Sequence, residues 1–148
     1  MRSHPQSKAT AARQRQPLRG ARHAVVWLDH AEAVVISFTE RESREQTVRS
    51  ELPPRRAHSD TGQSGSGHAR DDVDFFESVV RLIGDVPEVL IVGPGIAKTS
   101  FERYLHKHHQ LLASHIVGVE TVDHPTGGQI LKFGKQYFHA VDQLLGDR

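Results

Sequence analysis

The first folded part of the chain has strand-like patterns of apolar and polar residues. The segment HAVVWLD (residues 23–29) is apolar and rich in β-branched residues, and AVVISFT (33–39) repeats this character after a short polar interval. The next segment, RESREQTVRSE (41–51), is polar on both faces, which is typical of an exposed edge strand. Because the interval between the first two segments has the length of a hairpin turn, we predict three antiparallel strands in a meander.

After residue 70 the pattern changes to alternating helices and strands. The short, wholly apolar segment EVLIVG (88–93) predicts a strand buried on both faces, and HIVGVETVD (115–123) predicts another strand. Apolar residues at helical spacing predict three helices, the first with acids in its first turn and Gly84 as its cap. Their expected buried residues are Val73, Phe76, Val80 and Ile83, then Ala97, Phe101 and Leu105, and finally, in a helix over about 128–145, Ile130, Phe133, Tyr137, Val141 and Leu144.

The order of these elements, βββ-α-β-α-β-α, predicts an α/β fold. Antiparallel strands that continue into β-α-β crossovers give a mixed sheet with helices on its faces. That is the ribonuclease H-like arrangement. The fold by itself does not determine the function.

The chain of 148 residues divides into a basic tail and one folded domain. Residues 1–22 contain no acid, and they carry six cations: Arg2, Lys8, Arg13, Arg15, Arg19 and Arg22. We expect this tail to be disordered and to attract phosphates; a solvated extension, a mis-assigned start codon and an organelle transit peptide are the alternatives. Since the whole chain has a formal charge of +1, the tail leaves the remainder at −5. The domain is expected over residues 23–146, with a flexible loop rich in Pro, Gly and Ser at about 52–69.

Composition narrows the class of protein. The chain has no cysteine, so disulfides and thiolate metal sites are excluded, which fits a reducing compartment. Its apolar segments are far shorter than the roughly 20 residues that a membrane-spanning helix needs, and no apolar signal segment begins the chain. We therefore expect a cytoplasmic protein with no membrane partner.

Two segments of the second half resemble a family of translation proteins. VLIVGPGIAKTSFERYL (89–105) and VGVETVDHPTGGQILKFGKQYF (117–138) are similar to the second half of the middle domain of eukaryotic and archaeal peptide-chain release factors and of Pelota. The shared features are a buried strand that leads into a Gly-Pro-Gly turn, a lysine in the next helix start, a strand that ends in an acid, and a glycine pair before the last helix. GSGHA (65–69) resembles small bacterial proteins described as translational machinery proteins, which correspond to that domain alone. The resemblance covers about residues 23–140 and implies a translational machinery component-like fold of the ribonuclease H-like type.

The triplet Gly127-Gly128-Gln129 matches the peptide-release motif of these factors in its letters but not in its place. In release factors, the triplet lies in the long loop after the third strand, where its Gln helps to place a water at the peptidyl-tRNA ester. Here it lies between the last strand and the last helix, where the resemblance implies a structural glycine pair. From the residues alone, two glycines allow a tight turn with positive φ, and Thr126 is a candidate N-cap. We therefore interpret Gly127 and Gly128 as a structural turn.

The loop that corresponds to the catalytic loop of release factors contains Thr61-Gly62-Gln63 in place of the triplet. A β-branched threonine resists the backbone conformations that two adjacent glycines permit. Gln63 is therefore a weak candidate for peptidyl-tRNA ester hydrolysis, and we expect no catalytic residue.

The segment VGPGIAKTS (92–100) fails the P-loop pattern at both fixed glycines, so no nucleotide cofactor is expected. A Gly-Pro-Gly turn that leads into a helix nevertheless exposes unpaired N–H groups, which can bind an anion. Lys98 would add charge to that site, and because a cation in the first turn opposes the helix dipole, an anionic partner explains it better than helix stability does. Gly93, Gly95 and Lys98 are therefore candidate RNA-binding residues, with a solvated lysine as the alternative.

We predict that the protein binds the ribosome or structured RNA without catalysis. Lys98, Arg103 and Lys107 would position the folded domain on RNA phosphates. A second contact would come from loop residues Arg55, Arg56 and His68. No metal is expected, because the histidines that surround Lys107 have no evident third ligand.

Two other classes of function remain open from the sequence. One is an enzyme, either a peptidyl-tRNA ester hydrolase that uses Gln63 or a metal-dependent nuclease that uses Asp29 and Asp123, which end two strands. The carboxylate cluster of such a nuclease is incomplete, because no acid marks the end of EVLIVG. The other class is a protein-interaction module, such as a homodimer through the polar edge strand near Gln46–Ser50.

Overall fold

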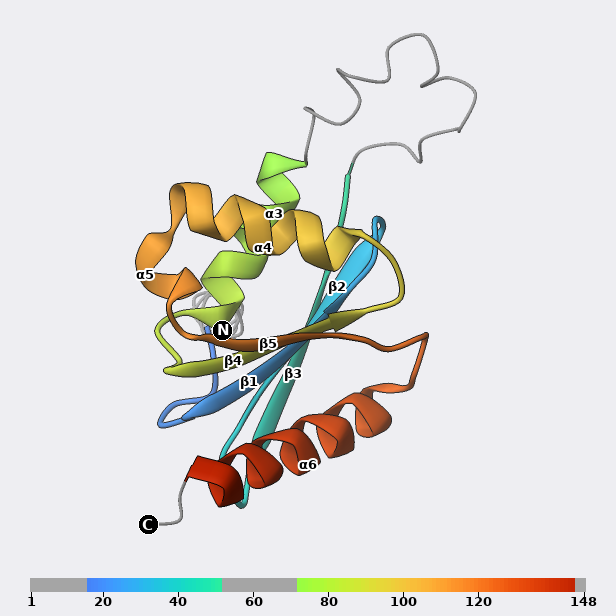
Figure 1. Cartoon of the computed structure of the whole chain (residues 1–148). Helices are drawn as coiled ribbons and strands as arrows, with labels where there is room; N and C mark the ends of the chain where they lie inside the picture. The colour runs from blue at the N-terminus through green and yellow to red at the C-terminus, as the bar shows by residue number, and fades with distance from the viewer. Residues whose placement is uncertain (1–15, 52–71, 146–148) are drawn as a thin grey trace, which may run out of the picture.

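The structure of the protein is a computed structural model that describes residues 16–51 and 72–145. Its strands are β1 (His23–Leu28), β2 (Glu32–Phe38), β3 (Ser43–Arg49), β4 (Glu88–Gly93) and β5 (Ile116–Thr121). Its helices are α3 (Val73–Ile83), α4 (Ala97–His108), α5 (Gln110–Ala113) and α6 (Gly127–Leu145), as Figure 1 shows. This order confirms the predicted βββ-α-β-α-β-α and adds the short helix α5. The loop predicted at about 52–69 lies outside the described residues.

The strands of the described part of the chain form one five-stranded sheet in the order β3-β2-β1-β4-β5. The pairs β1–β2 and β2–β3 are antiparallel, as the predicted meander requires. The pairs β1–β4 and β4–β5 are parallel, and α3 and α4 provide the crossovers that parallel strands need. The fold is therefore ribonuclease H-like, and β3 is an edge strand, as its polar faces predicted.

Apolar side chains pack on both faces of the sheet. Val26 and Ile91 belong to the core under α3, α4 and α5, whereas Val25 and Leu90 belong to the core under α6. Figure 1 shows these helices on opposite sides of the sheet. Because successive residues of a strand point to opposite faces, a strand between two helical layers must be apolar throughout. This explains why β4 is buried along almost its whole length, as the segment EVLIVG predicted.

Two of the three predicted helices agree only in part with their predicted apolar stripe. In α4 the expected residues, Ala97, Phe101 and Leu105, are all buried. In α3, however, Val73 is 50% exposed, and the buried stripe runs through Phe75 and Val79 as well as the predicted Phe76 and Ile83.

None of the helices within 16–51 and 72–145 is long and apolar enough to cross a membrane.

Helix α6 buries a stripe that differs from the predicted one. Its buried residues are Ile130, Gly134 and Phe138, whereas Leu144 is 83% exposed. Gly134 explains why the buried stripe runs along this side of the helix, because a Cβ at this position would lie only 3.0 Å from Cγ1 of Val25 on β1. Glycine lets the helix backbone approach the sheet at this point. The prediction counted apolar residues and therefore missed the residue at the centre of the contact, with Phe133, Tyr137 and Val141 only partly buried beside it.

Residues 16–22 pack against the folded domain, although the sequence placed them in the basic tail. The N–H of Leu18 donates a 2.7 Å hydrogen bond to Oγ of Ser37, and the guanidinium of Arg44 donates a 3.2 Å bond to the carbonyl of Gln16. Pro17 lies against Gly84, which ends α3 with a φ of 60°, as expected of a glycine cap. The folded domain therefore begins before the predicted boundary at residue 22.

Gly93→Ala should destabilise the protein, because a Cβ at this position would meet the carbonyl oxygen of Leu28 on the neighbouring strand. The backbones of two central strands would have to separate, and we expect a loss of about 1–3 kcal/mol in the free energy of unfolding, measured by urea denaturation. Gly95→Ala is the matched control, since it lies in the same turn with no atom within 4 Å of its Cβ position. Equal stabilities of the two variants would contradict the close approach of β4 to β1.

Candidate functional site

Three polar side chains meet where the parallel strands end. Asp29 follows β1, and Asp123 and His124 follow β5. Nε2 of His124 lies 3.5 Å from Oδ2 of Asp29, and Nδ1 lies 3.0 Å from Oδ1 of Asp123. Open α/β sheets place their ligand sites at the carboxyl ends of strands. This group, called here the His124 clasp (Asp29, Asp123 and His124), is therefore the first place to look for a catalytic site.

Backbone contacts hold the His124 clasp in place. The indole N–H of the buried Trp27 donates a 2.6 Å hydrogen bond to the carbonyl oxygen of Asp123, and the Trp27 ring meets that of His124 edge-on at 5.2 Å between centroids. Oδ1 of Asp29 accepts the N–H groups of Ala31 at 2.8 Å and Glu32 at 2.9 Å. These two bonds form an Asx turn that closes the β1–β2 hairpin. The clasp thus joins that hairpin to the segment between β5 and α6.

The His124 clasp does not have the geometry of a two-metal nuclease site. Such a site needs carboxylates that converge on ions about 3.5–4 Å apart. Here the imidazole of His124 lies between Asp29 and Asp123, and one oxygen of Asp29 already accepts two N–H groups. Within residues 16–51 and 72–145, no three His, Asp or Glu side chains are grouped so that they could hold a metal ion. The structure brings Asp29 and Asp123 to the same edge of the sheet, but as partners of a histidine.

The two carboxylates raise the pKa of His124. The hydrogen bond with Asp123 is the largest cause of this increase; burial opposes it, and the hydrogen bond with Asp29 adds a smaller increase. The clasp therefore favours the protonated, cationic imidazole. Because the His124 side chain is 62% exposed, water screens these interactions.

Lys98 has a partner inside the turn that precedes α4. Its Nζ donates a 2.5 Å hydrogen bond to the carbonyl oxygen of Gly95. The turn therefore provides a local reason for a lysine at this position, which weakens the prediction that an anionic partner explains Lys98 better than helix stability does. Gly93 likewise has a packing role, because of its close approach to Leu28. The N-cap position, Ile96, supplies no side-chain hydrogen bond to the helix.

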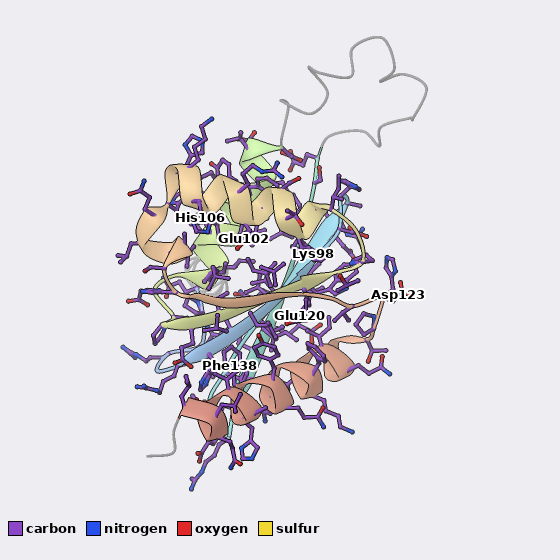
Figure 2. The ribbon with its side chains drawn as sticks, in the orientation of Figure 1. Lys98, Glu102, His106, Glu120, Asp123 and Phe138 are labelled. Atoms are coloured by element: carbon purple, nitrogen blue, oxygen red, sulfur yellow. The ribbon has the colours of Figure 1, made fainter. Side chains whose placement is uncertain are left out.

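The cations predicted on α4 do not form one surface. Residues four apart share a helix face, so the exposed Arg103 and Lys107 lie together. Lys98 is nine residues from Lys107, which is half a turn around the helix axis. Figure 2 shows Lys98 in line with Glu102 and His106 along α4, and Nε2 of His106 lies 3.8 Å from Oε2 of Glu102. The basic surface of α4 is thus the flank that Arg103 and Lys107 share.

The Gly-Gly-Gln triplet is part of a capping box at the start of α6. The N–H of Gln129 donates to Oγ1 of Thr126 at 3.2 Å, and the N–H of Thr126 donates to Oε1 of Gln129 at 2.8 Å. This confirms Thr126 as the N-cap. Neither Gly127 nor Gly128 has a positive φ, so the predicted reason for the glycine pair is wrong. A Cβ at Gly127 would meet only the carboxylate at the end of the exposed Glu45 side chain on β3, which can move, so this contact does not require a glycine.

Four predicted site residues lie outside the described part of the chain. They are the hydrolase candidate Gln63 and the proposed second contact Arg55, Arg56 and His68. All of them belong to the segment between β3 and α3.

A polar cluster that no sequence motif indicated joins α3 to α4. Oε2 of Glu77 accepts a hydrogen bond from the Tyr104 hydroxyl and lies 2.6 Å from Nε2 of His109. The hydrogen bond with His109, and then that with Tyr104, lowers the pKa of Glu77, while burial and the Glu77 carboxylate raise the pKa of Tyr104 to about 12. These residues are far apart in the chain, so no local pattern could have revealed the cluster.

A run of exposed polar residues on α6 is a further feature that was not predicted. Lys132, Lys135 and His139 are exposed, as are the amides of Gln129 and Gln136. Their spacing of three and four residues was visible in the sequence as one helix face.

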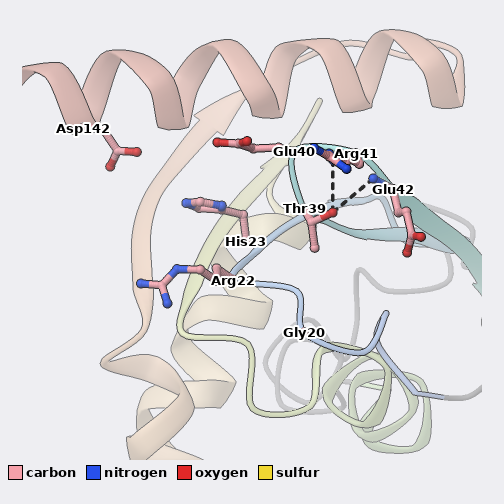
Figure 3. Close-up of a pocket in the computed structure, with 8 residues that line it drawn as sticks. All are labelled: Gly20, Arg22, His23, Thr39, Glu40, Arg41, Glu42 and Asp142. Carbon is pink, nitrogen blue, oxygen red and sulfur yellow. Dashed lines mark hydrogen bonds between the residues drawn. The ribbon is translucent and has the colours of Figure 1, made fainter.

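An open cavity of about 600 Å³ lies at the opposite edge of the sheet from the His124 clasp. Figure 3 shows its lining residues: Gly20, Arg22, His23, Thr39, Glu40, Arg41, Glu42 and Asp142. The Thr39 hydroxyl accepts the N–H groups of Arg41 at 3.2 Å and Glu42 at 3.0 Å, which shapes the β2–β3 turn. Acids and bases alternate around this cavity, so its charge favours no particular ligand.

No protein-family model matches the chain, and no curated protein sequence is significantly similar to it. Several solved structures, however, are similar to this chain in fold. Pelota from Archaeoglobus fulgidus superimposes with a TM-score of 0.55 and 15% identity over 89% of this chain, and Pelota from Thermoplasma acidophilum with a TM-score of 0.52 and 18% identity over 90%. The archaeal translation termination factor aRF1 gives a TM-score of 0.53 and 15% identity over 82%. The domain shares its fold with Pelota and aRF1.

This chain covers only part of each of these proteins: 35% and 37% of the two Pelota chains and 38% of aRF1. The match confirms the predicted resemblance to Pelota and release factors, and with it the ribonuclease H-like fold. At these identities the likeness is one of fold alone.

Asp123→Asn should lower the pKa of His124 towards its ordinary value of 6.5, because the hydrogen bond with Asp123 is the largest cause of the shift. An NMR titration of the His124 imidazole in the wild type and the variant measures this change. A pKa that folding raises adds stability below the unfolded value, and that stability is lost as the pH rises through the folded value. The wild type should therefore be more stable than His124→Gln at about pH 5.5, with a smaller difference at about pH 8.5. Identical titrations of His124 in the wild type and in Asp123→Asn would disprove the clasp.

Thr126→Ala should lower the free energy of unfolding by about 1 kcal/mol, because it removes the acceptor that caps α6. Gln129→Ala should also destabilise the protein, whereas Gln129→Glu should not, since glutamate completes a capping box and suits the helix dipole. Urea denaturation of the three variants measures these differences. The capping box is refuted if Gln129→Glu loses as much stability as Gln129→Ala.

Proposed function

We propose that the protein acts in translation by binding the ribosome or structured RNA, and that it does so without catalysis. The observation that carries this proposal is the fold, because aRF1, which shares it, is a translation termination factor. A cytoplasmic location and the absence of a cofactor belong to the same proposal.

Exposed cations on α4 support contact with RNA phosphates. Arg103 and Lys107 lie one turn apart, and neither forms an ion pair with another residue of the described ranges. A guanidinium fork and an ammonium at this spacing suit neighbouring phosphate oxygens. Glu102, the acid of this helix, pairs with His106 rather than with either cation.

Residues outside the described part of the chain complete the proposed contact. Arg55, Arg56 and His68 would touch RNA from the segment between β3 and α3, and the basic residues before residue 16 would add attraction that depends on salt. Lys98 would take part only if an anion replaces its hydrogen bond to Gly95.

The positions of the candidate catalytic residues favour binding over catalysis. Gln129 holds the start of α6, and Asp29 and Asp123 hold His124. An enzyme would therefore depend on Gln63, as the peptidyl-tRNA ester hydrolase alternative does.

A homodimer through β3 is the second candidate function. β3 is an edge strand, paired with β2 on one side only, and could accept a strand from a second copy. Its signature would be a mass that rises with protein concentration, measured by light scattering, without affinity for RNA.

The full chain should co-sediment with ribosomes at near-physiological salt, and Arg103→Gln/Lys107→Gln should reduce the bound fraction several-fold. The matched control is Arg41→Gln/Arg49→Gln, which removes the same charge at the two ends of β3; the surface pair of Arg49 with Glu32 adds little stability. A Lys98→Gln variant measures the contribution of the turn before α4.

A chain that lacks residues 1–15 keeps the packed residues 16–22 and separates the tail from the domain. Loss of co-sedimentation in this version, together with no effect of the α4 variant, would assign binding to the tail and contradict the proposed α4 surface. If the full chain neither co-sediments with ribosomes nor binds a structured RNA, the proposed function is wrong.

A further inference from the structure

One face of α6 is polar and free of acidic residues over most of the helix. It consists of Lys132, Lys135 and His139 together with Gln129, Gln136 and Gln143, and is called here the α6 outer face. Ile130, Gly134 and Phe138 pack against the sheet on the opposite side of the helix. Packing therefore explains the buried face of α6 but leaves the composition of its outer face unexplained.

The cations of the α6 outer face have no partners within the described part of the chain. Neither Lys132 nor Lys135 forms an ion pair there, and His139 forms none either. Asp142, the single acid of α6, lies near the end of the helix among the residues that line the cavity of Figure 3. Surface helices commonly gain stability from acid–base pairs three or four residues apart. No acidic residue of α6 lies at that spacing from Lys132 or Lys135.

We infer that the α6 outer face binds the phosphate backbone of structured RNA. Lysines attract phosphates, and glutamine amides donate hydrogen bonds to phosphate and sugar oxygens, which position a protein on a nucleic acid without reading its sequence. The inference rests on the proposed function for its partner, but it places the contact on a face that the proposed function does not use.

The exposed side chains favour RNA over an anionic membrane. A helix that lies on a membrane buries large apolar side chains in the lipid beside its cations. Between Gln129 and Gln143 the outer face has none, and the exposed leucines of α6, Leu144 and Leu145, follow at its end.

The geometry suits an extended polyanion. With a rise of 1.5 Å per residue, Lys132 and His139 are about 10 Å apart along the helix, a distance that spans more than one phosphate of a strand. Helix α6 lies on the opposite face of the sheet from α4, as Figure 1 shows. The domain therefore presents two separate basic surfaces, which can contact two segments of RNA at once.

The test is RNA binding by fluorescence anisotropy, with a labelled RNA hairpin and the full chain at several salt concentrations. Lys132→Gln/Lys135→Gln should weaken binding several-fold and reduce the slope of log affinity against log salt by roughly 1 for each lysine. Lys132→Arg/Lys135→Arg should keep both the affinity and the slope. Glutamine and arginine have helix propensities close to that of lysine, and equal thermal unfolding of the variants verifies that the fold is intact.

Two comparisons separate this inference from the proposed function. If Arg103→Gln/Lys107→Gln weakens binding and Lys132→Gln/Lys135→Gln does not, the α6 inference is wrong while the proposed function stands. If the wild type does not bind the hairpin, the α6 inference is wrong, and co-sedimentation with ribosomes decides the proposed function separately. An equal effect of the control Arg41→Gln/Arg49→Gln would also overturn the inference, because net charge alone would then explain the loss. The inference would also be overturned if Lys132→Gln/Lys135→Gln lost binding to vesicles that contain an anionic lipid while its RNA binding stayed unchanged.

Discussion

The parallel pairing of β1 with β4 is the contact on which the rest of the structure depends. Both strands lie inside the sheet order β3-β2-β1-β4-β5 and contribute side chains to the cores on its two faces. Their register, with Trp27 opposite Val92, sets which side chains face α6 and which face α3 and α4. A shift of one residue would turn each strand's side chains to the other face, so this pairing must be unique. Gly93 is part of the same constraint, because it lets β4 end close against Leu28.

That pairing also determines what lies at the carboxyl edge of the sheet. It brings the turn after β1 beside the segment after β5, and Trp27 fixes the two together through the carbonyl of Asp123. In this chain the polar residues of the edge bind one another, with the His124 imidazole between two carboxylates. The edge where this fold class places ligands is thus used to join the β1–β2 hairpin to the start of α6. Exposed cations that form no ion pair within the described residues lie instead on the outer sides of α4 and α6.

The sequence was sufficient for the order of elements, because each depends on local pattern: alternation in the edge strand, a wholly apolar run in β4, and helical spacing in α4. It was also sufficient for Thr126, because capping is a local interaction. It failed where a contact involves two distant segments. Gly134 faces the sheet because the helix backbone lies close to Val25 there, and the Glu77–Tyr104–His109 cluster forms only when α3 meets α4. Lys98, Arg103 and Lys107 were all predicted to contact RNA phosphates, but helix geometry places Lys98 about half a turn away from Lys107.

The Gly-Gly-Gln triplet illustrates why the chemistry of a motif depends on the element that carries it. In a loop, two glycines give the backbone freedom and leave a glutamine side chain available; at the start of a helix, the same glutamine is bound to the N–H of Thr126. The capping box makes the first turn of α6 well defined, and Ile130, Gly134 and Phe138 hold the helix to the sheet along its length. A helix held in this way keeps its outer side chains at fixed separations, which is what repeated contact with phosphates requires. In the proposed RNA-binding role, the residues that resemble a catalytic motif would therefore contribute indirectly, by supporting the helix whose exposed side carries Lys132 and Lys135.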